Sequence, residues 1–353
     1  MSEAGTAATL RGLAAARSSA VLRISARYGA ITAVALAVFA VVLLVSGKDP
    51  LKAFADTFRF TLASAYGFSE LLVRMTPLLL AAVAVALPAR LGLINVGGEG
   101  QLYMGALAAS AGAFLFPGAP AWILLPVVLV LGFLGGAAWA AIPGILRAAK
   151  LVNETVSTLL LNYIPPLIVG WLIFGPWRAP ENSGYPQSPA YPKAALLPAL
   201  FDTRVHAGLF VALASLAAYG LLLDKTRWGV EMRAIGGNPE AAQRLGIAVP
   251  AWQVVGLALG GGFAGLAGMG EAMGIAGRLQ QSLSPGYGFI GFLIAWLAGG
   301  RPLGILFMAF LFAIITAAGD ILQISQGLPY AGVNILLAII LFIVLGSRAR
   351  SSQ

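Results

Sequence analysis

Long hydrophobic runs, separated by short polar segments, dominate the chain from residue 28 onward. Tyr28–Ser46 holds nineteen residues without a charge, and the uncharged stretch 100–146 is broken once, by FPGAPAW. About 20 apolar residues in a helix cross the hydrocarbon core of a bilayer. The pattern predicts ten transmembrane helices, at about 28–46, 70–89, 95–116, 121–146, 153–175, 205–223, 251–275, 284–300, 302–322 and 330–346.

Composition supports an all-α, polytopic transmembrane bundle. Of 353 residues, 59% are hydrophobic and only 10% are charged, whereas ordinary soluble domains carry about 25% charged residues. The chain has no cysteine, so neither a disulfide framework nor a thiolate metal site can be proposed. The single histidine, His206, begins an apolar run and is expected to be interfacial.

The distribution of basic residues predicts the orientation. With the N-terminus in the cytoplasm, fourteen of the 22 Lys and Arg residues lie on the inner side, as the positive-inside rule requires. An even number of spans then places both termini in the cytoplasm. We divide the chain into a basic N-terminal tail (1–27), a transmembrane permease domain (28–347) and a short C-terminal tail (348–353). The net charge of +9 is attributed to this topology and to anionic lipid.

Two loops inside the transmembrane domain have distinct compositions. The outer loop, 176–204, is rich in Pro, Trp and Tyr, which favours the external interface. The inner loop, 224–250, is the longest charged segment and contains a short predicted helix. Asn238 suits its N-cap, Pro239 its first position and Glu240 its first turn, and Gly246 can end it. This helix is either a docking element or a surface connector.

Polar residues among glycines begin the third predicted span, in the sequence NVGGEGQ. Asn95, Glu99 and Gln101 fall there. Glycines permit close helix approach or a local break, and a broken helix that lines a cavity is common at transporter sites. The alternative is that Glu99 pairs with Arg90 and fixes packing.

A second polar cluster opens the fifth predicted span. Glu154 and Ser157 share one helical face with Thr158, which in turn shares a face with Asn162. Pro165–Pro166 should kink the span just beyond. The cluster either lines a path or serves as polar contact between helices. The candidate path residues are therefore Asn95, Glu99, Gln101, Glu154, Thr158 and Asn162.

Other features limit the function further. Glu271 and Asp320 fall near outer span ends, where hydrated interfacial side chains are expected, and the small residues from Gly256 to Gly277 predict close helix packing. The chain contains no phosphate-binding loop, nucleophile motif or clustered metal-ligand pattern, so we expect neither catalysis nor a bound metal. Amides, aromatic rings and few charges suit a neutral, hydrogen-bonding solute.

From residue 70 onward the sequence resembles a known family. The segments INVGGEGQLYMGALAA, NETVSTLLLNYI, GGNPEAAQRLGI and GYGFIGFLIAWLAGGRPLG are similar to ABC-importer permeases of the branched-chain amino acid and simple-sugar class. NVGGEGQ and NETVSTLLLNYI look most like nucleoside permeases that work with basic-membrane-lipoprotein binding proteins.

This resemblance implies partners that composition does not. They are cytoplasmic ATP-binding subunits that carry ATP-Mg, a second permease subunit (a related chain or a copy) and an extracytoplasmic solute-binding protein. No cofactor is expected in this chain. It also implies a multi-pass protein of the bacterial cytoplasmic (inner) membrane. GGNPEAAQRLGI is similar to the ATPase-docking loop, although the Ile and Leu-Pro ending of the general pattern is not in register. The implied coupling residues are Gly237, Asn238, Pro239, Glu240, Ala241, Ala242 and Gly246.

The sequence thus predicts the permease subunit of an ATP-driven, binding-protein-dependent importer, with nucleosides, and purine nucleosides in particular, as the favoured solute. Ribose-like sugars and branched-chain amino acids remain as alternatives within the class. A further alternative is a stand-alone channel or ion-coupled carrier for neutral solutes. This alternative is less favoured, because it gives the charged inner loop no role. A lipid-modifying membrane enzyme is a more remote one.

Overall fold

A computed structural model describes residues 37–327, apart from 39, 42, 181–184 and 201. The predicted span 330–346, most of the span 28–46 and both predicted tails lie outside these residues. The chain forms two compact units, one of Thr61–Ala317 and one that combines Met1–Phe60 with Ala318–Gln353.

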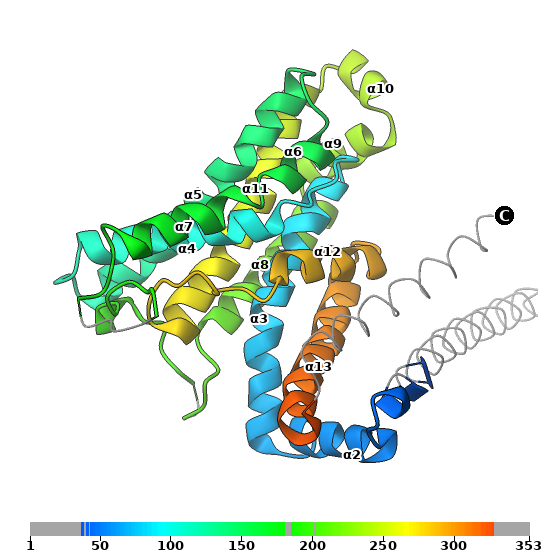
Figure 1. The fold of residues 1–353 in the computed structure, drawn as a ribbon. Coiled ribbons are helices and arrows are strands. Elements are labelled where there is room, and N and C mark those ends of the chain that lie inside the picture. The colour runs from blue at the N-terminus through cyan, green and yellow to red at the C-terminus, as the bar shows by residue number, and fades with distance from the viewer. Residues whose placement is uncertain (1–36, 39, 42, 181–184, 201, 328–353) are drawn as a thin grey trace, which may run out of the picture. The chain divides into compact units, whose positions relative to one another are not determined.

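Every regular element among the described residues is helical, which confirms the all-α prediction for that part of the chain (Figure 1). Two isolated β-bridges, Gln187–Gln280 and Ala199–His206, lie outside the helices. From residue 61 onward the elements are α3 (Ala65–Ala89), α4 (Gly98–Leu115), α5 (Ala121–Ala148), α6 (Glu154–Leu160), α7 (Ile164–Phe174), η1 (Lys193–Ala195), α8 (Gly208–Lys225), α9 (Arg227–Gly237), α10 (Pro239–Arg244), α11 (Val249–Gly270), the π-helical turn η2 (Glu271–Ala276), α12 (Tyr287–Leu297) and α13 (Pro302–Gln326).

Six helical stretches in the described part are long and apolar enough to cross a membrane. They are Ala65–Ala89, Ala121–Ala148, Glu154–Phe174, Gly208–Lys225, Val249–Ala276 and Pro302–Ile324. Each coincides with a predicted span. The helix expected over 284–300 is shorter than predicted, since α12 has eleven residues. At about 1.5 Å per residue it rises about 16 Å, roughly half the thickness of a bilayer core.

α11 lies at the centre of the larger unit and packs against α3, α4 and α5. Its small residues allow this, as predicted. A Cβ atom added to Gly265 would lie 2.2 Å from the carbonyl oxygen of Gly132 in α5, and one added to Gly105 in α4 would lie 2.2 Å from Gly265 Cα. Such separations are possible only without side chains, so glycine sets the distance between these helices.

Burial differs sharply between α3 and α5. The apolar residues from Leu78 to Leu87 of α3 are at most 1% exposed, which is typical of a helix that is hydrophobic all round. By contrast, α5 exposes Val130, Leu134 and Ile145 by more than half. An apolar outward face of this kind is what lipid covers, and it supports a multi-pass membrane protein.

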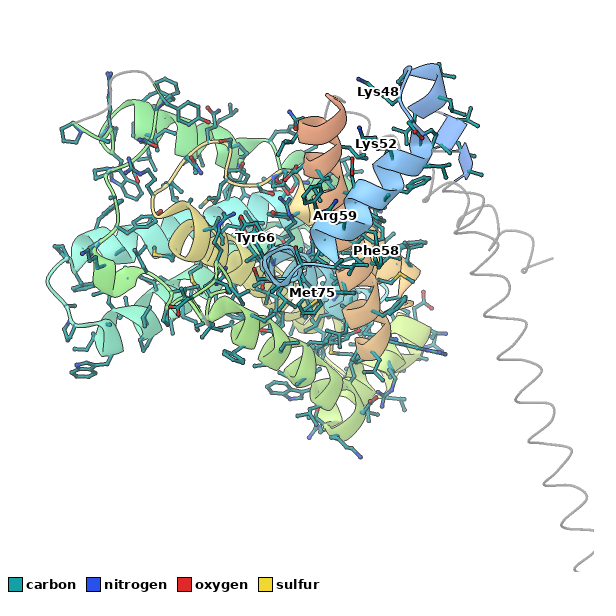
Figure 2. All side chains as sticks on the ribbon, turned by 90° about the horizontal axis from the view of Figure 1, so that it is seen from below. Lys48, Lys52, Phe58, Arg59, Tyr66 and Met75 are labelled. Carbon is teal, nitrogen blue, oxygen red and sulfur yellow. The ribbon has the colours of Figure 1, made fainter. Side chains whose placement is uncertain are left out.

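The smaller unit contains α2 (Pro50–Thr61) apart from its last residue, and this helix was not predicted from the sequence. Asp49 caps it: Oδ1 accepts hydrogen bonds from the N–H groups of Leu51 (2.9 Å) and Lys52 (3.3 Å). An aspartate followed by proline is a helix-start signal, so the sequence did contain the information. Figure 2 shows the side chains of Lys52, Phe58 and Arg59 on this helix.

Candidate functional site

α6 presents a polar face formed by Glu154 and Thr158, and Asn162, two residues past the end of the helix, continues this face at the same interval of four residues. Asn153 begins the helix, because its Oδ1 accepts a hydrogen bond of 2.8 Å from Thr155 N–H. The predicted break is present, but α6 already ends at Leu160 and the two prolines lie in the first turn of α7. Proline lowers helix stability little at these positions, since the first N–H groups of a helix have no intrahelical partner.

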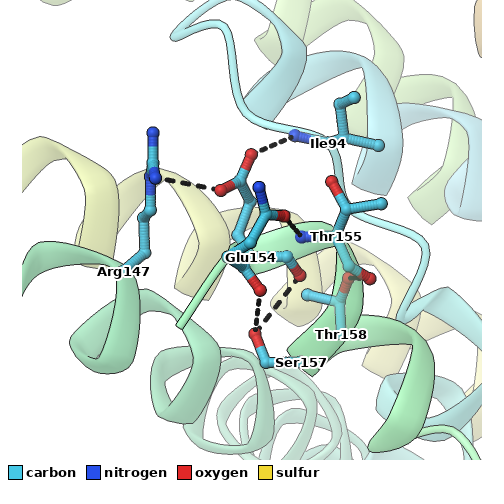
Figure 3. Close-up of polar contacts among 7 residues, drawn as sticks. Ile94, Arg147, Glu154, Thr155, Ser157 and Thr158 are labelled. Atoms are coloured by element: carbon cyan, nitrogen blue, oxygen red, sulfur yellow. Dashed lines mark hydrogen bonds and ion pairs between the residues drawn. The ribbon is translucent and has the colours of Figure 1, made fainter. Parts of the chain in front are cut away.

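Glu154 joins two segments that are distant in sequence (Figure 3). Its Oε2 lies 3.1 Å from Arg147 Nε at the end of α5, as an ion pair without hydrogen-bond alignment. Its Oε1 accepts a long hydrogen bond of 3.4 Å from Ile94 N–H. The Glu154 side chain is 6% exposed and that of Arg147 is 41% exposed. A buried carboxylate therefore connects the end of α5 to the loop that precedes α4.

Thr158 and Asn162 hold the next part of the same loop. Thr158 Oγ1 accepts a 3.2 Å hydrogen bond from Val96 N–H. Asn162 donates through Nδ2 to the Val96 carbonyl oxygen and accepts through Oδ1 from Gly100 N–H, both at 2.8 Å. The break before α4 leaves backbone N–H and C=O groups without helical partners, and the polar face of α6 forms hydrogen bonds with them. Backbone groups in an apolar environment require such partners.

Asn95 and Gln101 form a closed pair on the other side of that loop. Asn95 Nδ2 donates to Gln101 Oε1 at 3.0 Å, and Gln101 Nε2 donates to Asn95 Oδ1 at 2.9 Å. Asn95 also donates to the Ala84 carbonyl of α3 (3.2 Å) and accepts from Gly97 N–H (3.0 Å). Both amides are at most 1% exposed.

Glu99 contacts a different helix. Its Oε2 accepts a 2.8 Å hydrogen bond from the backbone N–H of Gly288, in the first turn of α12. The expected alternative partner, Arg90, donates instead to Tyr219 Oη (3.1 Å) and to the Gly300 carbonyl. The alternative prediction, in which Glu99 pairs with Arg90, is therefore wrong. A carboxylate at a helix N-terminus satisfies an open N–H and is favoured by the helix dipole.

An irregular segment of bends and turns between η2 and α12, residues 277–286, runs beside Glu99. Tyr103 Oη donates to the Gln281 carbonyl at 2.7 Å, and the Ser284 side chain and the Gly286 backbone interact with the Glu99 carboxylate. Neither Tyr103 nor Ser284 is among the site residues predicted from the sequence. SPGYG, which is rich in turn-forming residues, was the available sign of a break there.

The structure thus brings the six predicted path residues into one region around the start of α4. Four of them (Asn95, Glu154, Thr158 and Asn162) bind backbone groups of residues 84–100, and Gln101 completes the Asn95 pair. The sixth, Glu99, extends the region to α12.

The predicted inner-loop helix exists as α10. Asn238 Oδ1 accepts a 3.0 Å hydrogen bond from Ala241 N–H, Pro239 is the first residue, and Gly246 has a φ of 83°, a left-handed conformation that glycine favours. Of the predicted coupling residues, Ala242 is buried and the others are exposed. The neighbouring Leu245 is 80% exposed, so the helix offers an open surface.

α9 fixes this region to α11 through Glu231. Its carboxylate accepts hydrogen bonds from Arg227 Nε (2.7 Å) and from Trp252 Nε1 (2.8 Å). The first of these, with help from the second, lowers the pKa of Glu231 below its usual value. Trp228 stacks edge-on against Trp252, with ring centroids 6.1 Å apart.

A family described as "Branched-chain amino acid transport system / permease component" matches residues 67–345. The chain belongs to this permease family. A glucose ABC transporter permease protein of Haloferax volcanii is 37% identical over 89% of this chain and 85% of its own. A guanosine ABC transporter permease protein of Bacillus subtilis is 32% identical (89% and 91%), and a nucleoside ABC transporter permease protein of Lactococcus lactis is 30% identical (86% and 86%). No solved structure matches the chain.

This permease is an ABC transporter subunit and a multi-pass membrane protein, and the ATPase is on a separate subunit. His206 is 2% exposed, with Nδ1 accepting from Gly208 N–H at 3.1 Å. The expectation of a hydrated side chain at Glu271 is wrong. Glu271 is not hydrated but 7% exposed, near the cations Arg74 and Arg204. Within the described ranges, His, Asp and Glu form no group of three that could hold a metal ion.

Proposed function

We propose that this permease subunit serves an ATP-driven, binding-protein-dependent importer of nucleosides, with purine nucleosides as the favoured solute. The observation that carries the proposal is the buried network of amides and hydroxyls around the start of α4, beside the broken connection from η2 to α12. Such a region suits a neutral solute with many hydrogen-bonding groups, because it offers neutral dipoles and few unpaired charges. Relatives named for guanosine and for nucleosides support the same class.

A sugar is the second candidate, because a glucose permease is among the relatives, at 37% identity. A nucleoside contains a ribose, so both solute classes present hydroxyl groups to the same kind of surface. Selection between them falls mainly to the separate binding protein in this proposal, since a permease that bound its solute tightly would release it slowly.

The six path residues have two conceivable roles: to contact the solute, or to hold the broken helices that form the path. The hydrogen bonds of Asn95, Gln101 and Asn162 favour the second role, because these amides are already satisfied within the chain. We assign Asn95, Gln101, Thr158 and Asn162 to holding the path, with Glu154 on its inner side and Glu99 beside the segment 277–286.

The proposed assembly places this chain in the cytoplasmic membrane with ten spans and both termini in the cytoplasm. Two ATP-binding subunits that carry ATP-Mg dock on α10, and a second permease chain completes the pathway. The binding protein delivers solute on the side of the outer loop, 176–204. Support comes from the exposure of α10 and from the ABC transporter permeases among the relatives.

Competition uptake tests the solute class. Cells with the intact transporter are compared with cells that lack this chain, and labelled guanosine is challenged with uridine, ribose, glucose and leucine. We expect chain-dependent uptake that only nucleosides reduce. Competition by glucose or ribose would move the assignment to sugars, and competition by leucine would move it to amino acids.

Co-purification tests the docking assignment. Glu240→Lys reverses an exposed charge on α10 and should lower recovery of the ATP-binding subunit with the permease. Asp224→Lys is the matched control, because Asp224 is also an exposed carboxylate, at the end of α8 and outside α10. Equal recovery with both variants would remove α10 from the docking surface.

A further inference from the structure

A cleft of about 820 Å³ opens beside α10. One wall is the turn between α5 and α6, with Arg147, Lys150 and Asn153. The other wall is formed by α10 and the residue before it, with Asn238, Glu240 and Gln243. The surface proposed to dock the ATP-binding subunit is therefore one side of a cleft, and the other side comes from a segment nearly ninety residues earlier in the chain.

The charges of this cleft are available to a partner. Lys150, Glu240 and Gln243 are exposed, and their side chains form neither ion pairs nor hydrogen bonds with other described residues. Lys150 has a φ of 58°, the left-handed conformation that lets the chain turn directly from α5 towards α6. A cation thus faces the cleft from one wall and an anion from the other, which suits a polar protein segment with both charges rather than an apolar one.

The first wall is connected to the loop that begins α4. Arg147 is half-exposed at the cleft and pairs with the buried Glu154 at 3.1 Å, while the other oxygen of Glu154 accepts from Ile94 N–H (Figure 3). A buried carboxylate is strongly destabilised if its partner is removed. A displacement of Arg147 must therefore move Glu154 with it or break a costly pair.

The second wall reaches the same loop by another route. α9 leads directly into α10, and its Gly236 lies against the loop: a Cβ atom added there would be 2.3 Å from the carbonyl oxygen of Arg90. The first wall therefore reaches the segment from Arg90 to Ile94 through Glu154, and the second wall reaches it through α9. From there the α4 network continues to Glu99 and the first turn of α12.

We propose that the cleft is a two-walled docking surface for the ATP-binding subunit and that the Arg147–Glu154 ion pair passes its displacement to the loop before α4. Closure of the two ATP-binding subunits would change the separation of the walls. Glu154 then shifts Ile94 and the polar face of α6, which reorients the start of α4 and, through Glu99, the start of α12. Glu154 is thus a positioning residue for transport, and the inference rests on the docking role proposed for α10.

The absence of cysteine from the chain allows a direct test of both walls. Single cysteines at Lys150 and Gln243 are treated with a thiol-to-amine cross-linker in the full complex. Gly118→Cys is the control, because Gly118 precedes α5 and the 28 residues of that helix separate it from the cleft by about 42 Å. We expect both cleft cysteines, and not the control, to cross-link to the ATP-binding subunit.

The two proposals fail in different ways in this experiment. A cross-link from Gln243→Cys alone would leave docking on α10 intact and overturn the part of the first wall, between α5 and α6, in docking. Cross-links from neither position would remove the docking role itself, and the further inference with it.

Reconstituted vesicles that contain the complex and its binding protein test the ion pair. Glu154→Gln keeps the size of the side chain and removes its charge. We expect unchanged recovery of the ATP-binding subunit and continued ATP hydrolysis, with labelled guanosine uptake per ATP lower by about tenfold, within the usual range of coupling between sites. The charge exchange Arg147→Glu with Glu154→Arg should restore part of this ratio.

Glu70→Gln is the matched control, because Glu70 forms another Arg–Glu pair, 3.0 Å from Arg204, away from the cleft. Its uptake per ATP should equal that of the unmodified complex. An unchanged ratio in Glu154→Gln would overturn the transmission role while leaving docking in place. An equal loss of uptake per ATP in Glu70→Gln would also overturn the transmission role, because the effect would not be specific to the cleft.

Discussion

The carboxylate of Glu99 in α4 binds the backbone N–H of Gly288 in α12, 189 residues further along the chain, at 2.8 Å. Gly98 and Gly288 make this possible, because a Cβ atom on Gly288 would lie 2.1 Å from Glu99 N. The start of one helix thereby holds the start of another at the broken part of the bundle. This contact gives the intramembrane carboxylate a partner, which its depth in an apolar chain demands.

Replacement of Glu99 should separate transport from folding. Glu99→Gln keeps one acceptor oxygen for Gly288 N–H, so we expect normal protein levels and reduced uptake. Glu99→Ala leaves that N–H without a partner, at a cost of about 1–3 kcal/mol, and should also lower the unfolding temperature in detergent. A Glu99→Gln variant that loses protein level but transports normally per molecule would make the residue purely structural.

The amide pair predicts an order of stability between two variants. Gln101→Met removes two hydrogen bonds, and each should contribute about 1 kcal/mol to stability. Both polar atoms of Asn95 keep another partner in this variant, the Ala84 carbonyl and the Gly97 N–H. Asn95→Leu also strands the Ala84 carbonyl and the Gly97 N–H, so it should cost more. Unfolding midpoints in detergent measure both. If Gln101→Met abolished uptake at unchanged stability, Gln101 would be a solute contact.

The packing of α11 predicts a steric effect at Gly265. Gly265→Ala places a Cβ atom 2.2 Å from the Gly132 carbonyl, and overpacking of this kind costs about 1–3 kcal/mol or more. Yield and thermal unfolding should both fall. Gly118→Ala is the control, because nothing lies within 4 Å of its added Cβ. Equal stability of the two variants would contradict the observed separation of α5 and α11.

The cap of α10 predicts a local effect on coupling. Asn238→Ala removes the acceptor for Ala241 N–H, which typically costs a helix about 1 kcal/mol. We expect weaker co-purification of the ATP-binding subunit with an unchanged unfolding temperature of the permease. Asn238→Asp keeps a capping oxygen and should restore binding. Failure of Asp to restore it would assign the effect to a direct contact of the asparagine rather than to the cap.

Glu231 predicts a pH dependence. Hydrogen bonds from Arg227 and Trp252 lower its pKa from the usual 4.5, so its stabilising contribution is present above that pH and is lost as the pH falls through the lower native pKa. Thermal unfolding of the unmodified permease and of Glu231→Gln should therefore differ at neutral pH and converge in acid. A constant difference across that range would contradict the assignment.

Local features of this permease followed from its sequence. The apolar runs located the six helical stretches of the described residues that are long and apolar enough to cross a membrane, and the Asn238–Pro239 pair located α10. The four-residue spacing located the polar face of α6. Each of these depends on a few neighbouring residues, because helix periodicity and capping act over one or two turns. The same reasoning, applied to Asp49–Pro50, would have predicted α2.

The partners of the polar groups were decided by tertiary structure. Sequence spacing could not pair Glu99 with Gly288 rather than Arg90, nor bury His206 and Glu271. It could not bring Arg147 and Glu154 to Ile94 either. A buried polar group binds whichever donor or acceptor packing places within about 3 Å, and glycine contacts between α4, α5, α11 and α12 set those positions. The sequence therefore determined which groups needed partners, and the close approach of distant helices determined which partners they found.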